Sequence, residues 1–151
     1  MIEKLKNSDL VMARKIQIVF QASYTIEAKL LSATNFPPLQ RTLENYIQSK
    51  TAFYGYSKNG ELSAVVEINT DNDFILIRSL VVHPKKFRQG IAGKLIEFVF
   101  ETFESDLFIV ETGLANGPAT KLYEKFGFVA VRQWDTDFGI RKVKFDKRIE
   151  N

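Results

Sequence analysis

A basic, glycine-containing loop lies near the middle of this 151-residue chain. Its positive charge comes from Lys85, Lys86, Arg88 and Lys94. Apolar spacing over residues 91–104 predicts a helix, and Gly90 and Gly93 lie at its start. A helix start presents unpaired backbone N–H groups and the positive end of the helix dipole, and small residues let phosphate oxygens approach closely. The loop therefore indicates a site for a polyanion, with a solvated loop and packing glycines as the alternative.

Two common phosphate-binding motifs do not fit these glycines. A Walker A loop requires glycine where Arg88 stands, five residues before Gly93, and Ser or Thr where Leu95 stands. The dinucleotide fingerprint G-x-G-x-x-G requires a third glycine at an offset that this segment lacks. The loop thus predicts anion binding without naming the ligand.

A second segment, residues 116–128, combines a helix cap with a phenol. Asn116 is a typical N-cap, Pro118 suits the first turn, and Gly127 suits the end of a helix. Tyr123 follows Asn116 by two helical turns, so both side chains share one face. A phenol with a pKa of about 10 stays protonated at neutral pH and can donate a proton to a leaving group. A structural cap and a core tyrosine are the alternative for each residue alone.

Together, the two segments resemble motifs A and B of the GNAT superfamily of N-acyltransferases. Motif A has the pattern (Gln/Arg)-x-x-Gly-x-(Gly/Ala), and Phe87 departs from its first position in the segment Phe-Arg-Gln-Gly-Ile-Ala. Motif B, Asn-x-x-Ala-x-x-Leu-Tyr-x-x-x-Gly-Phe, matches residues 116–128 at every specified position. The resemblance covers about residues 51–147, and residues 1–50 correspond to the family's variable helical region.

The resemblance implies direct transfer of an acetyl group from acetyl-CoA to a primary amine of a small molecule or protein, without an acyl-enzyme. The implied cofactor contacts are Leu80, Val81, Val82, Phe87, Arg88, Gln89, Gly90, Ile91, Ala92, Gly93, Asn116, Ala119 and Tyr123. Asn116 would contact the pantetheine arm, and Tyr123 would protonate the departing thiolate. The backbone N–H of Val82 would polarise the thioester carbonyl.

An amine must lose a proton before it attacks a thioester, so a general base is expected. Glu67 and Glu111 lie on predicted central strands and are the candidate catalytic bases, each with a surface carboxylate as the alternative. His83 precedes a proline at a strand end and is interpreted as structural or as a residue that supports the site from behind. The acceptor pocket is expected between the N-terminal helices and the last hairpin. Its candidate walls are Tyr24, Phe36, Phe53, Trp134 and Phe138.

The elements that must position these residues follow from periodicity. Helices are predicted over residues 9–23, 39–47, 91–104 and 116–126, with a further helical stretch over residues 25–31. Strands are predicted over residues 51–57, 61–69, 74–83, 107–111, 128–134 and 140–145, with turns at Asn59-Gly60 and residues 70–73. The predicted fold is α/β (α+β): a mixed, mostly antiparallel sheet flanked by helices in the order α-α-β-β-β-α-β-α-β-β. It forms one domain over residues 1–151.

Composition narrows the classes of function. The chain has no Cys and one His, which excludes disulfides, thiolate catalysis and cysteine- or histidine-rich metal sites, so no metal is expected. No apolar segment resembles a signal peptide or a membrane span, so a cytoplasmic protein is expected. The net charge is only +3, with basic and acidic residues interleaved, which argues against a nucleic-acid partner. A non-catalytic acyl-CoA-binding module is the alternative function, and a homodimer is left open.

Overall fold

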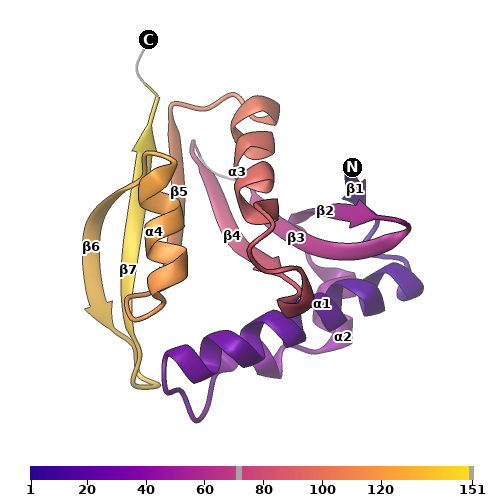
Figure 1. Ribbon diagram of the computed structural model, residues 1–151, viewed down its shortest axis with the longest axis horizontal. Helices are drawn as coiled ribbons and strands as arrows, with labels where there is room; N and C mark the ends of the chain where they lie inside the picture. The colour runs from indigo at the N-terminus through magenta and orange to yellow at the C-terminus, as the bar shows by residue number, and fades with distance from the viewer. Residues whose placement is uncertain (71–72, 150–151) are drawn as a thin grey trace.

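The computed structural model describes residues 1–70 and 73–149, which form a seven-stranded mixed sheet with helices packed on it (Figure 1). The strands are β1 (Ile2–Leu5), β2 (Ala52–Lys58), β3 (Glu61–Asn69), β4 (Ile75–Val82), β5 (Leu107–Gly113), β6 (Val129–Asp135) and β7 (Arg141–Arg148). The helices are α1 (Leu10–Leu30), α2 (Leu43–Gln48), α3 (Ile91–Thr102) and α4 (Gly117–Lys125), with 3-10 turns η1 (Pro37–Gln40) and η2 (Pro84–Lys86). The predicted fold class is confirmed.

The predicted order of elements needs one correction at its start. Strand β1 precedes the helices and pairs antiparallel with β2, from Ile2 opposite Tyr56 to Leu5 opposite Phe53. A strand of four residues is too short for periodicity to indicate it, and its partner is distant in the chain. The two predicted helical stretches before residue 31 are one helix, α1, which is capped by the Asp9 carboxylate. The predicted turn at residues 70–73 includes residues 71 and 72, which lie outside the described residues.

Two apolar cores lie on opposite faces of the sheet. The strand order is β1-β2-β3-β4-β5-β7-β6, and only the β4–β5 pair is parallel. Helices α3 and α4 cover one face, where Leu95 and Tyr123 pack among strand residues such as Val66 and Val110. Helices α1 and α2 close the second core, which contains Phe20. In Figure 1, α1 runs below the lower ends of β4 and β5.

Strands β4 and β5 pair only briefly and then separate. Their register covers three positions, from Ile75 opposite Phe108 to Ile77 opposite Val110. Beyond these positions each strand keeps only its outer neighbour, β3 for β4 and β7 for β5. The described part of the chain thus leaves the inner edges of residues 78–82 and 111–113 without a strand partner. We call this V-shaped opening the split (Figure 1).

A β-bulge lies where the split begins. Glu67 of β3 pairs with Ser79 of β4, whereas the next residue, Ile68, pairs with Ile77. Arg78 is therefore an extra residue in β4 without an opposite partner in β3. A bulge bends its strand and increases the local twist, and this one directly follows the last β4 residue that pairs with β5.

Candidate active site

The loop between β4 and α3 presents backbone N–H groups rather than a side-chain cap. Asp9, Thr42 and Asn116 cap the other three helices with side-chain oxygens, but Gly90 at the N-cap of α3 provides none. Arg88 (φ 64°) and Gly90 (φ 74°) both adopt the left-handed conformation. Such alternation can form a concave group of N–H donors, and the N–H groups of the first helical turn have no partner within the helix. The loop is therefore suited to an anion.

The two glycines of this loop have different roles. Gly90 has a left-handed φ and open space where a side chain would begin, so its type is required by backbone conformation and leaves access to the loop. A Cβ on Gly93 would lie 3.0 Å from the Phe126 ring, so Gly93 permits close packing of α3. Phe87, at the start of the loop, is 42% exposed.

His83 has a local structural contact, which is one of the two roles expected from the sequence. Its Nδ1 accepts a hydrogen bond of 3.2 Å from the backbone N–H of Lys85 and so caps η2. This contact holds the turn that leads from the end of β4 toward the loop.

On the β5 side of the split, Asn116 joins α4 to α1. Its Oδ1 accepts from the backbone N–H of Ala119 at 3.2 Å, which confirms the predicted cap. Its Nδ2 donates to Glu27 Oε1 at 2.9 Å, and Thr112 Oγ1 lies 3.4 Å from the same oxygen. Burial raises the pKa of the Glu27 carboxyl, although these hydrogen bonds and the charge of Lys142 oppose the rise.

Sequence reasoning missed Glu27, although its spacing offered a signal. Phe20, Tyr24 and Glu27 lie four and three residues apart, so Glu27 continues the stripe of α1 that faces the protein interior. A carboxylate on such a stripe requires partners that are not visible from α1 alone. Here they come from β5 and α4, more than half the chain away.

Two tyrosines lie in the electrostatic field of Glu27. Tyr123 is 5% exposed, and burial together with the charges of Glu27 and Tyr24 raises the pKa of its phenol. Burial also raises the pKa of Tyr24, while a hydrogen bond with Ser79 opposes the change. Both phenols therefore stay protonated through the physiological range, and Tyr123 retains the proton that its predicted role requires.

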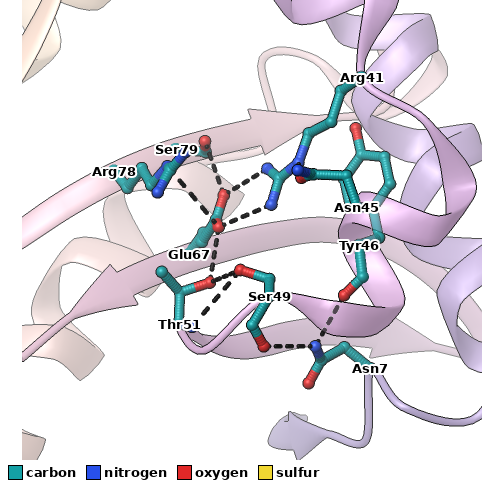
Figure 2. A network of polar contacts seen from close by, with 9 residues as sticks. All are labelled: Asn7, Arg41, Asn45, Tyr46, Ser49, Thr51, Glu67, Arg78 and Ser79. Carbon is teal, nitrogen blue, oxygen red and sulfur yellow. Dashed lines mark hydrogen bonds and ion pairs between the residues drawn. The ribbon is translucent and has the colours of Figure 1, made fainter.

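Glu67 of β3, a candidate base, is fully buried in a polar network that joins the sheet to the segments around α2 (Figure 2). Arg41 binds it with two hydrogen bonds, of 2.8 and 3.0 Å, and Arg41 itself lies 4.2 Å from the centre of the Tyr46 ring. The hydroxyls of Thr51 and Ser79 donate to the same carboxylate at 2.6 and 3.1 Å. Burial alone would raise the pKa of Glu67, but these hydrogen bonds and the charge of Arg41 lower it.

Glu111, the other candidate base, lies on the split edge of β5 and is exposed. Its carboxylate is 3.9 Å from the Lys142 ammonium of β7. The two candidate bases therefore differ sharply: Glu67 is surrounded by donors, and Glu111 faces solvent beside one cation.

The candidate walls of the acceptor pocket do not all meet. Tyr24 and Phe36 lie edge to face at 5.8 Å between ring centres. Phe53 is fully buried in the core beneath α1 and cannot line a pocket. Trp134 belongs to the outermost strand, β6, which β7 separates from β5, and its ring lies beside Arg132.

Comparison with known proteins decides the family. Residues 20–128 match the model of the acetyltransferase (GNAT) family, a range that includes both sides of the split and the glycine loop. The chain belongs to the acetyltransferase (GNAT) family. The GNAT domain thus shares its family with acetyltransferases.

This chain matches only part of the length of a curated relative. The UPF0157 protein YqkA of Bacillus subtilis (strain 168) is 35% identical over 129 residues, which are 85% of this chain and 38% of the relative. The GNAT chain therefore spans well under half of that relative.

Solved structures share the GNAT fold at low identity. The ribosomal-protein-S18-alanine N-acetyltransferase of Escherichia coli has a TM-score of 0.78 at 18% identity, covering 100% of this chain and 94% of the other. The PaiA N-acetyltransferase of Thermoplasma acidophilum, solved in complex with coenzyme A, has a TM-score of 0.74 at 17% identity, covering 99% and 98%. Within residues 1–70 and 73–149, no helix could cross a membrane and no cluster of His, Cys, Asp and Glu could hold a metal.

Proposed function

We propose that this domain transfers an acetyl group from acetyl-CoA directly to a primary amine, and that the transfer takes place in the split. The observation that carries the proposal is the separation of β4 from β5 beyond Ile77 and Val110. The separation leaves the inner edges of both strands free to pair with a ligand. The free edge of β4 continues through η2 to the start of α3, which has no side-chain cap. A long, thin ligand with an anionic group and amide groups matches such a surface.

The residues of this path fit coenzyme A in two ways. The N–H groups of residues 88–93 would hold the pyrophosphate at the start of α3, where the helix dipole also favours negative charge. The free edge of Leu80, Val81 and Val82 would pair with the pantetheine amides as an added strand would. Acetyl-CoA supplies an activated thioester, whose carbonyl carbon is open to attack by a neutral amine.

Tyr123 is the proposed proton donor to the sulfur that leaves. No hydrogen bond joins its hydroxyl to another residue of 1–70 or 73–149. Its raised pKa keeps the phenol protonated until negative charge builds up on the sulfur. The acceptor remains a small molecule or a protein, and a cytoplasmic location and a homodimer stay predictions.

The first experiment is calorimetric titration with acetyl-CoA, dephospho-CoA and ATP, followed by release of free thiol with a panel of amines. Binding of acetyl-CoA together with amine-dependent thiol release would support the proposal. Binding without release for any amine would favour the acyl-CoA-binding module. No binding of any coenzyme A species would overturn the proposal.

A further inference from the structure

Glu27 is a carboxylate at the split that the described residues engage on one oxygen only. Asn116 and Thr112 donate to Oε1, at 2.9 and 3.4 Å. No residue of 1–70 or 73–149 donates a hydrogen bond to Oε2. One oxygen thus fixes the position of the carboxylate, and the other is available to a ligand.

The partners of Glu27 place it where an acetyl acceptor would react. Thr112 lies on the part of β5 beyond its last pair with β4, and Asn116 caps the helix that carries the proposed acid, Tyr123. Tyr24 precedes Glu27 by one turn of α1 and contacts Ser79 of β4. Glu27 therefore lies on the β5 side of the split, one helical turn from a residue that contacts β4, and within the electrostatic reach of Tyr123.

We infer that Glu27 is the general base that removes a proton from the acceptor ammonium, an inference that rests on the proposed acetyl transfer. Its two carboxylate oxygens suit this role in different ways. Protein donors engage one oxygen and orient the group, and the other oxygen is available to the amine.

Three titratable side chains interact electrostatically with Glu27, and they lie on α1, α4 and β7. Tyr24 lies on its own helix, Tyr123 on α4 and Lys142 on β7, where Lys142 also faces Glu111 of β5. Burial is the largest influence, and the pKa of Glu27 lies above its ordinary value. A carboxylate with a raised pKa binds a proton more strongly and is a better base at neutral pH.

The other candidate carboxylates are less suited to this role. Glu67 already receives hydrogen bonds on both oxygens, and its lowered pKa weakens it as a base. Its geometry is that of an anchor between the sheet and the segment before α2. Glu111 is exposed and has no hydrogen bond that would orient it.

Glu27 takes one proton from the ammonium and releases it to solvent. The freed lone pair forms the nitrogen–carbon bond, and the carbon–sulfur bond breaks with its electron pair on sulfur. Tyr123 gives its proton to the sulfur and recovers one from the new amide nitrogen. The products are the acetylated amine, the free thiol and one proton in solution.

The test compares Glu27→Gln with the wild type on two amines of similar size. Ethylamine is almost entirely protonated at neutral pH, whereas 2,2,2-trifluoroethylamine is mostly neutral and needs no base before attack. We expect Glu27→Gln to lower kcat/KM roughly 100-fold for ethylamine, the usual contribution of a general base. For trifluoroethylamine we expect a loss of only a few-fold. Glu101→Gln, exposed on the last turn of α3, serves as the control.

Three results would overturn the inference. Equal losses on both amines would show that Glu27 only supports the structure, and no loss on either would show that it is not involved. A selective loss in Glu111→Gln instead of Glu27→Gln would assign the base to Glu111.

A second measurement does not depend on turnover. Titration of ¹³C-labelled glutamate carboxyls by NMR, with Glu27→Gln used for assignment, should give Glu27 a midpoint above those of the exposed glutamates. A midpoint among those of the exposed glutamates would overturn the inference. Failure to bind acetyl-CoA would instead count against the proposed function.

Discussion

The side-chain amide of Asn116 donates a hydrogen bond of 2.9 Å to the carboxylate of Glu27, which precedes it by 89 residues. The same Asn116 caps α4. One residue thus fixes the helix that carries Tyr123 and, at the same time, a carboxylate of α1. The two groups that the proposed reaction requires are held by one side chain.

Glu27 should cost stability at neutral pH. Its pKa is raised in the folded protein, so the unfolded chain ionises more readily and folding loses free energy as pH rises above about 4.3. We expect Glu27→Gln to be at least as stable as the wild type at pH 7, with a smaller advantage at pH 4. Urea denaturation at the two pH values measures this. A variant that is less stable than the wild type at pH 7 only would show that the charge stabilises the fold.

Gly90→Glu should abolish acetyl-CoA binding in calorimetry, because it adds a side chain and a negative charge at the proposed pyrophosphate site. Gly60→Glu is the matched control: both glycines have nearly the same φ, 74° and 76°, and open space around them. The two variants should lose similar stability. Unchanged affinity in Gly90→Glu would separate the loop from coenzyme A.

Tyr123→Phe should lower kcat by roughly 100-fold with little change in acetyl-CoA affinity, because only the proton donor is removed. The wild-type rate should not fall in mildly alkaline solution through loss of the Tyr123 proton, since its pKa is raised. Tyr54→Phe, whose ring packs against Phe98 at 5.1 Å, is the control. Full activity of Tyr123→Phe would show that another group protonates the thiolate.

Arg41→Met should lower the free energy of unfolding by about 3–5 kcal/mol, because it leaves the buried Glu67 carboxylate without its principal partner. Urea denaturation at pH 7 measures the loss. Exchange of Arg132, whose side chain is exposed beside Trp134, should cost far less. A small loss in Arg41→Met would mean that Glu67 is satisfied by its hydroxyl donors.

The same network predicts acid sensitivity. The pKa of Glu67 is lowered in the folded state, so its contribution is complete above about 4.3 and is lost as pH falls toward the folded value. Glu67→Gln should show a weaker fall in unfolding free energy over this acidic range than the wild type. Parallel curves for the two proteins would contradict the assignment.

The sequence predicted local structure well where one segment carries the signal. The Asn59-Gly60 turn has both residues at positive φ, and Asn116 caps its helix as expected. The helix start that the sequence predicted at residues 90–91 is that of α3, whose N-cap is Gly90. What the sequence could not provide was pairing between distant segments: β1 on β2, Glu27 on Asn116, and Arg41 on Glu67. Each depends on tertiary contacts that no local period encodes.

The bulge at Arg78 changes which residues of β4 face the α3 core. Ile75 and Ile77 face the α3 core, and after the bulge Leu80 and Val82 do so, so the inward-facing positions change from odd to even numbers. The split therefore depends on the number of residues in β4 and not on the type of residue at position 78. Exchange of Arg78 for another residue should preserve it, whereas deletion of that one position would restore a regular strand and extend its pairing with β5.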